Sequence, residues 1–201
     1  MEDHQYIKEL QNGNEKALQF LYEQYAEGIY NTILGFVKNQ EDAEELLQDV
    51  FVIVYDKAVN FKFDSAVSTW MYRIAVNKSL DFLRKKKAQK RFGIFTAIYR
   101  KDETEPRSEL VEVMHPGIKQ EQKEESLLLF KLIDELSMKQ KVAFTLTQID
   151  GRPQEEVAEI METTRKAIES LVKRAKENLK KSLINHYPER GKAKKNTSKK
   201  I

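Results

Sequence analysis

Apolar residues recur every three to four positions along most of this chain, which is the spacing of amphipathic helices. The first stretches run from Tyr6 to Leu10 and, after Asn14, which can cap a helix, through Val37. A long helix is predicted over residues 41–58 and another from about residue 65 to 87, with a short loop between them. The first half of the chain is therefore predicted to be entirely helical.

The periodicity lapses over residues 92–122, which contain Pro106, Pro116 and many acids, and it returns at about Glu124. The later apolar patterns predict helices over about 124–136, 142–149 (closed by Gly151), 154–161 and 165–183. We expect an all-α protein with two small helical domains joined by a flexible linker. The predicted boundaries are a first domain at 5–91, a linker at 92–123, a second domain at 124–183 and a basic disordered tail at 184–201.

The composition excludes several kinds of protein. The 201 residues contain no cysteine, which rules out disulfide scaffolds, thiolate zinc sites and cysteine nucleophiles. The three histidines are far apart in the sequence, so no histidine metal site is predicted. No run approaches the roughly 18 apolar residues of a membrane span. The acidic N-terminus lacks the features of a signal peptide, and we expect a cytoplasmic protein.

Charge is segregated along the chain. Residues 1–60 carry 12 acidic and 4 basic side chains, whereas residues 61–91 carry 2 acidic and 9 basic ones. Residues 138–201 form a second basic block, with 16 basic and 8 acidic side chains. Two basic blocks separated by acidic ones indicate two contacts with a polyanion, although solvated helix faces and a lysine-rich tail would produce a similar pattern.

The pattern over residues 154–183 predicts a helix-turn-helix. Ala158 is small where the two helices would touch, and Thr164 can cap the second helix. Glu162 stands in the turn where such motifs commonly have glycine, so either it adopts an unusual backbone conformation or the turn differs. The polar face of the second helix carries Arg165, Lys166, Glu169, Ser170, Lys173 and Arg174. Such a face can enter the major groove of DNA, but an αα-hairpin with a solvated face has the same pattern.

The first half of the chain carries two further polar patterns. On the helix predicted over residues 41–58, a mainly acidic stripe opposite the apolar face consists of Glu45, Gln48, Asp49 and Val52. The loop after this helix contains Asn60, Phe61, Lys62, Phe63, Asp64 and Ser65. The next helix carries Trp70, Tyr72, Arg73, Asn77, Lys78, Asp81, Arg84 and Lys85. Aromatic rings stack on unpaired bases and cations bind phosphates, so this mixture suits separated DNA strands. Phe61, Phe63 and Trp70 can equally be core aromatics, and the sequence leaves that choice open.

Two segments in this part of the chain resemble bacterial RNA polymerase sigma factors. They are Asp42-Ala-Glu-Glu-Leu-Leu-Gln-Asp-Val-Phe-Val-Ile-Val-Tyr55 and Ser68-Thr-Trp-Met-Tyr-Arg-Ile-Ala-Val-Asn-Lys-Ser-Leu-Asp-Phe-Leu-Arg84. Together with the helix-turn-helix they are similar to the sigma-70 family in its small extracytoplasmic-function (ECF) form. The resemblance places region 2 at about residues 5–91 and region 4 at about 124–183.

The resemblance implies a transcription initiation factor, not an enzyme, without a cofactor or metal. Its partners would be core RNA polymerase (the beta-prime clamp and the beta subunit), promoter DNA and, as is common in the family, an anti-sigma factor. The stripe from Glu45 to Val52 would dock on the clamp helices. Residues 60–65 and the polar residues from Trp70 to Lys85 would melt and read the −10 element, with the loop holding a flipped base. The 165–174 face would read the −35 element as duplex.

Glu169 has two interpretations within that face. A carboxylate there could accept a hydrogen bond from a cytosine amino group, or it could pair with Lys173 one helical turn away. We expect the pair with Lys173.

Two other functions compete with this interpretation. A helix-turn-helix regulator that never joins polymerase would need neither the acidic stripe nor the aromatic loop. A metal-dependent phosphohydrolase could use Asp42, Glu44, Glu45 and Asp49 as oxygen ligands for magnesium. However, no second acidic helix at ligand spacing is evident in the first domain, and no nucleophile with a partner base is evident.

Overall fold

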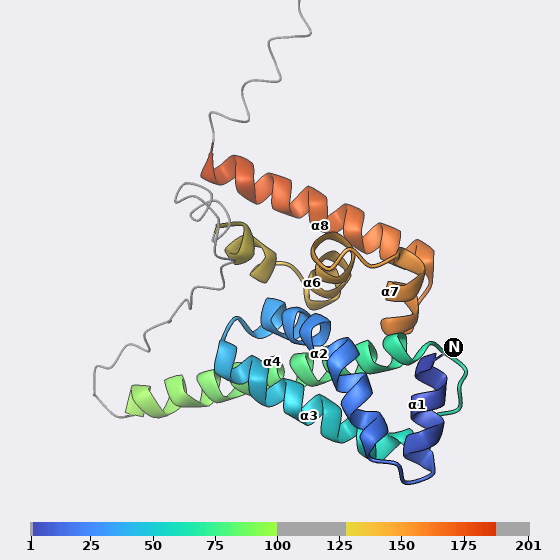
Figure 1. Ribbon diagram of the computed structural model, residues 1–201. Helices are drawn as coiled ribbons and strands as arrows, with labels where there is room; N and C mark the ends of the chain where they lie inside the picture. Colours follow the sequence, from blue (N-terminus) through green and yellow to red (C-terminus); the bar gives the residue numbers. More distant parts are fainter. Residues whose placement is uncertain (1, 100–127, 188–201) are drawn as a thin grey trace, which may run out of the picture. The chain divides into compact units, whose positions relative to one another are not determined.

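The computed structural model describes residues 2–99 and 128–187 (Figure 1). The chain divides into two compact units, Met1–Val113 and Met114–Ile201, which we call unit 1 and unit 2. Every regular element within the described ranges is a helix, which confirms the predicted all-α fold.

Unit 1 consists of α1 (Glu2–Gln11), α2 (Lys16–Val37), α3 (Gln40–Ala58) and α4 (Val67–Tyr99). Helix α2 packs against each of the other three, and α3 also packs against α4 (Figure 1). The side chains buried between them come from the predicted apolar faces: Ile7, Leu21, Ile29, Ile33, Phe36, Val50, Val54 and Met71.

Asparagines mark the starts of α2 and α3. The Asn14 side-chain oxygen accepts a hydrogen bond from the backbone N–H of Lys16 at 3.2 Å, but the N-cap position of α2 is occupied by Glu15, whose side chain makes no capping bond. Between α2 and α3, Lys38 adopts a left-handed φ of 57° and the Asn39 side chain accepts from the Asp42 N–H at 2.8 Å. This cap is the physical reason for the break in the apolar pattern after Val37.

Helix α4 is longer than the sequence pattern predicted. The prediction ended the helix at about Lys87 and began the linker at residue 92, but α4 continues to Tyr99. Residues 88–91 are good helix formers, and the one glycine that follows, Gly93, costs only about 1 kcal/mol in a helix. The rest of the predicted linker, and the predicted tail from residue 188 on, lie outside the described residues.

Unit 2 begins its described part with a helical stretch over residues 128–134. There follow α6 (Met138–Phe144), the π-helical turn η1 (Thr145–Ile149), α7 (Gln154–Ile160) and α8 (Arg165–His186). The helix predicted over 142–149 thus starts earlier and ends in a π-turn, where the N–H of Asp150 donates to the carbonyl of Thr145. Gly151, with φ of 69°, closes it as predicted.

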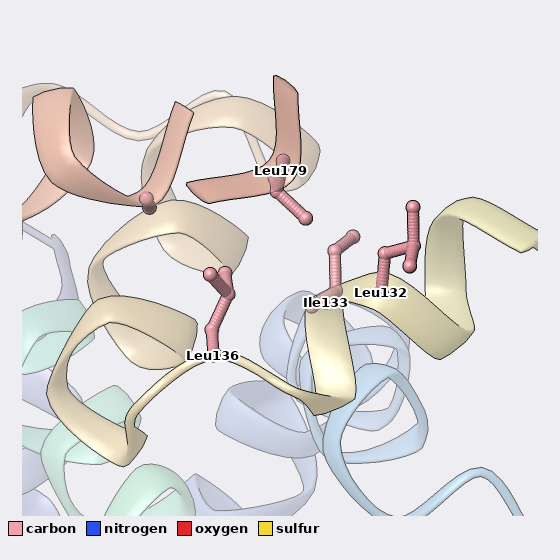
Figure 2. Packing of buried hydrophobic residues seen from close by; sticks show 5 residues of the cluster. Leu132, Ile133, Leu136 and Leu179 are labelled. Carbon is pink, nitrogen blue, oxygen red and sulfur yellow. The ribbon is translucent and has the colours of Figure 1, made fainter. Parts of the chain in front are cut away.

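The core of unit 2 joins the 128–136 segment to α8. Leu132, Ile133 and Leu136 pack with Ala175 and Leu179, and Figure 2 shows Ile133 and Leu136 directed toward the helix that carries Leu179. This packing holds α8 by its apolar side and leaves its opposite face on the surface of unit 2.

Candidate nucleic-acid interface

The predicted acidic stripe lies on the surface of α3. Glu45 and Gln48 are exposed, Asp49 is half-exposed, and the Val52 side chain is 59% exposed although it is apolar. The same side of the helix continues through Tyr55 and Val59, which are also exposed. The sequence analysis missed these last two residues, although their helical spacing from Val52 could have identified them. An exposed apolar strip bordered by acids is a typical protein-binding surface.

The side chain of Tyr55 is hydrogen-bonded to Glu15 at the start of α2. Its hydroxyl donates a hydrogen bond to the Glu15 carboxylate at 3.1 Å. This bond and the negative charge of Glu15 raise the pKa of Tyr55 above its usual value of 10.0. The tyrosine is therefore held neutral, with its ring on the α3 surface.

Two ion pairs connect α3 with α4. Lys78 Nζ lies 2.7 Å from Asp49 Oδ2, and Lys86 Nζ lies 2.8 Å from Asp42 Oδ2. The stripe on α3 and the basic face of α4 therefore meet along one edge.

A cleft of about 410 Å³ lies at the loop between α3 and α4 (residues 59–66). It is lined by Lys57, Asn60, Phe61, Lys62, Asp64, Ser65, Trp70 and Arg73. The structure thus brings together most of the loop residues with the first two turns of α4. Lys57 was missed, because it precedes the loop and shows no aromatic neighbour in the sequence.

The aromatic residues of this region differ in accessibility. Phe61 is only 7% exposed and Tyr72 only 4% exposed, so both belong to the core. Phe63 and Trp70 are half-buried, and Phe61 lies between them, with its ring centroid 5.1 Å from Phe63 and 4.7 Å from Trp70. Of the predicted aromatic set, Phe63 and Trp70 are therefore the more accessible, but the rings that line the cleft are those of Phe61 and Trp70.

The polar face of α4 extends away from the cleft. Asn77, Asp81, Arg84 and Lys85 are exposed, while Arg73 and Lys78 are half-buried. Arg84 and Asp81 form an exposed ion pair at 2.6 Å. The face is thus polar and mainly basic, with one internal acid.

The helix-turn-helix of unit 2 has the predicted turn. The Thr164 side chain accepts from the Ala167 N–H at 3.2 Å and so caps α8. Glu162 adopts φ of 51°, the left-handed conformation, which was one of the two possibilities that the sequence left open. The N–H of Thr163 then donates to the carbonyl of Ala158, the small residue at the helix contact.

All six predicted residues of the α8 face are exposed: Arg165, Lys166, Glu169, Ser170, Lys173 and Arg174. The pairing within that face differs from our expectation. Glu169 accepts from Nε of Arg165 at 3.1 Å rather than pairing with Lys173. Nη1 of the same arginine lies 2.7 Å from Glu155 of α7, so Arg165 bridges two carboxylates. The ion pair with Glu155 explains why Glu169 pairs with Arg165 and not with Lys173, because it holds the Arg165 side chain next to Glu169.

A shallow groove of about 360 Å³ continues this face toward the end of α8. It is lined by Gln154, Glu169, Val172, Lys173, Lys176, Glu177 and Lys180. Lys176 and Lys180 were not among the predicted DNA contacts, although they follow Lys173 at helical spacing. The basic surface is therefore longer than predicted.

Within residues 2–99 and 128–187, no three His, Cys, Asp or Glu side chains are placed to hold a metal ion. None of the helices in these ranges is long and apolar enough to cross a membrane.

The fold and these surfaces define a helical, helix-turn-helix DNA-binding protein. The family model for sigma-70 region 2 matches residues 21–89, and the model for sigma-70 region 4 matches residues 126–179. The chain therefore belongs to the sigma-70 family of RNA polymerase sigma factors, in its ECF form, which confirms the resemblance found in the sequence.

Curated relatives match over nearly the whole chain. The RNA polymerase sigma-H factor of Pseudomonas aeruginosa is 27% identical over 189 residues, covering 90% of this chain and 94% of that protein. The ECF RNA polymerase sigma-E factor of Escherichia coli is 28% identical over 171 residues, covering 85% of this chain and 88% of that protein.

Two solved structures have a similar fold. CnrH in complex with the cytosolic domain of CnrY has a TM-score of 0.65 and 20% identity, covering 90% of this chain and 96% of that chain. The sigma factor RpoE in complex with the anti-sigma factor NepR from Bartonella quintana has a TM-score of 0.61 and 21% identity, covering 84% and 97%.

Proposed function

We propose that this chain is a transcription initiation factor that joins core RNA polymerase and directs it to particular promoters. It recognises the −35 element as duplex DNA through α8 and melts the −10 element at the cleft of unit 1. The observation that carries this proposal is the presence, in one chain, of an aromatic and basic cleft, an acidic stripe next to the basic face of α4 and a helix-turn-helix.

The α3 stripe is the proposed docking surface for the clamp helices of the beta-prime subunit. Its acidic residues attract a basic partner surface, while the exposed Val52 offers an apolar centre. A regulator that acts without polymerase has no use for this surface, which is why we favour the initiation factor over that alternative.

The cleft is the proposed site for a base of the opened −10 element. Stacking a base on an aromatic ring contributes about 1–3 kcal/mol. Unstacking a base from duplex costs a few kcal/mol. Because the two are comparable, the half-buried Trp70 together with Arg73 and Lys62 can trap an opened strand without ATP.

The N-terminal part of α8 is the proposed reader of the −35 element. Helix α8 projects Arg165, Lys166 and Ser170 from its first turns, the part of a recognition helix that contacts base edges in the major groove. Lys173 and the lysines of the groove beyond it follow along the same helix and suit phosphate contacts.

The role has consequences for chemistry, location and control. We propose no catalytic activity for this chain, since the polymerase performs the chemistry of transcription. It acts in the cytoplasm, where a bacterial promoter and polymerase meet. An anti-sigma factor that covers its polymerase- or DNA-binding surfaces is a natural regulator, since the structurally similar RpoE was solved in complex with the anti-sigma factor NepR.

In vitro transcription with core RNA polymerase and a pool of promoter fragments tests the proposal. The chain should produce transcripts from a subset of promoters, and permanganate should detect unpaired thymines near each start site. Trp70→Ala should bind core polymerase and duplex DNA normally but open the promoter less. A regulator without polymerase would instead bind DNA and fail to support transcription.

A further inference from the structure

Helix α1 contacts the loop between α3 and α4 through polar side chains. The amide nitrogen of Gln11 donates to the backbone carbonyl of Ala58 at 2.8 Å and to that of Phe61 at 3.2 Å. Ala58 is the last residue of α3, and carbonyls at a helix end have no partner within the helix. One side chain thus connects the end of α3 to the first part of the loop.

Two other α1 residues hold the far part of the loop. His4 Nε2 lies 3.4 Å from the carbonyl oxygen of Ser65, and its ring meets the ring of Phe63 edge to face with centroids 5.3 Å apart. Lys8 Nζ lies 5.7 Å from the Phe63 ring centroid. Helix α1 therefore contacts the loop at its start, middle and end.

The loop conformation needs such support. Phe63 adopts φ of 60°, which a residue with a side chain adopts only at a cost of about 1–2 kcal/mol. A strained residue persists where its surroundings hold it. The contacts from α1 are three separate constraints on this segment, and the segment forms one wall of the cleft.

We propose that α1 positions the α3–α4 loop for base binding, with Gln11 as the main positioning residue. The inference rests on the proposed function of the cleft and extends it to a helix that precedes the matched region 2, which starts at residue 21. Gln11 does not line the cleft; it acts by keeping the loop in the shape that accepts a base. A pre-ordered loop loses less conformational freedom on binding, so the affinity for a base rises.

The full-length chain allows a direct test because Trp70 is its one tryptophan and lines the cleft. The probes are homopolymeric single strands of adenine, cytosine or thymine nucleotides and an abasic strand of equal length. Labelled-strand anisotropy reports total affinity, and Trp70 emission reports base stacking. The wild-type chain should bind at least one base-bearing strand more tightly than the abasic strand, with a change in Trp70 emission.

Gln11→Met removes both hydrogen bonds without adding charge. It should weaken binding of base-bearing strands by about five- to tenfold and leave abasic binding unchanged. Gln11→Glu, which keeps the shape but cannot donate, should reduce the ratio of base-bearing to abasic affinity in the same way. Gln5→Met is the matched control, because Gln5 is exposed on α1 and bonds to Glu9 of the same helix.

The outcomes distinguish failure of the proposed base site from failure of the proposed positioning role of Gln11. If the wild-type chain does not distinguish base-bearing from abasic strands, the cleft is not a base site and the proposal falls with it. If the wild-type chain distinguishes them and a folded Gln11→Met chain does so equally, only the positioning role is overturned. Should Gln11→Met fail to fold, as judged by circular dichroism, His4→Leu tests the contacts of α1 with the far part of the loop. It should weaken binding of base-bearing strands by the same factor.

Discussion

Asp49 on α3 and Lys78 on α4 form an ion pair, with 2.7 Å between Oδ2 and Nζ. Asp49 belongs to the proposed polymerase-binding stripe and Lys78 to the proposed DNA-binding face. The two surfaces therefore share an edge, where the carboxylate of Asp49 in the proposed polymerase-binding stripe neutralises the ammonium group of Lys78 in the proposed DNA-binding face. This arrangement allows a charge-swap experiment that separates docking from stability.

Asp49→Lys should abolish most of the affinity for core polymerase but change the free energy of unfolding by less than about 1 kcal/mol, because the pair is substantially exposed. Loss of one partner of a charge pair that becomes buried on binding costs about 2–5 kcal/mol. The double variant Asp49→Lys/Lys78→Asp re-forms the pair and should recover stability without recovering docking. Core affinity is measured with labelled protein and stability with urea.

A control for charge is available on α2. Glu23 and Glu27 are exposed and one turn apart, and their replacement by lysine should leave core binding intact. If the charge swap restored core affinity, Asp49 would act through the α3–α4 contact rather than by touching the polymerase.

Arg165 should be a major determinant of −35 recognition. Its Nε and Nη1 are held by Glu169 and Glu155, which orients the guanidinium and leaves one Nη1 hydrogen and both Nη2 hydrogens to donate to a base. Arg165→Ala should reduce the preference of the holoenzyme for its −35 sequence by about 1–3 kcal/mol if the contact is bidentate. Competition binding among duplex promoters measures this preference.

Lys181→Ala removes the same charge from an exposed site near the other end of α8 and serves as the comparison. It should weaken all duplexes alike or not at all, and a lost phosphate contact would lower the salt slope by about 0.9. Equal loss of selectivity in the two variants would argue against a specific role for Arg165.

Glu162→Gly should stabilise unit 2. Glu162 has φ of 51°, a conformation that glycine adopts without steric cost. Glycine loses more backbone entropy on folding, so the net increase in the free energy of unfolding should be about 0.5–1 kcal/mol. Glu159→Gly, in the last turn of α7, should instead destabilise by about 1 kcal/mol. Urea unfolding followed by circular dichroism compares them, and a loss of stability in Glu162→Gly would contradict the strain argument.

Gly28 and Tyr72 should be energetically coupled. A Cβ at position 28 would overlap the hydroxyl oxygen of Tyr72 but lie 3.6 Å from its Cζ, an ordinary contact. Gly28→Ala should therefore destabilise by about 1–3 kcal/mol through overpacking, offset in part by better helix propensity. In a Tyr72→Phe background the same change should cost at least about 1 kcal/mol less. Urea unfolding of the four proteins in this cycle gives the coupling, and a cost independent of residue 72 would disprove the clash.

The sequence by itself was sufficient to predict the helices, the family and much of the turn chemistry. Helical spacing determines which side chains share a face, so the stripe from Glu45 to Val52 and the exposed face of α8 could be located from the sequence. The Thr164 cap was also predictable, and the unusual backbone of Glu162 was one of two alternatives, because both depend on interactions within a few residues. The domain boundaries and the roles of individual site residues remain predictions.

Only the tertiary structure decided which members of a face are covered and which charges pair. Phe61 and Phe63 are equivalent in the sequence, but Phe61 is packed against Trp70 in the core and Phe63 is only half-buried. Glu169 has a basic residue one turn away on either side, and Glu155 of another helix favours Arg165. The contacts of α1 with the α3–α4 loop join residues almost fifty positions apart in the chain. Periodicity fixes the side of a helix on which a residue lies, but the neighbouring element that reaches that side is determined by packing.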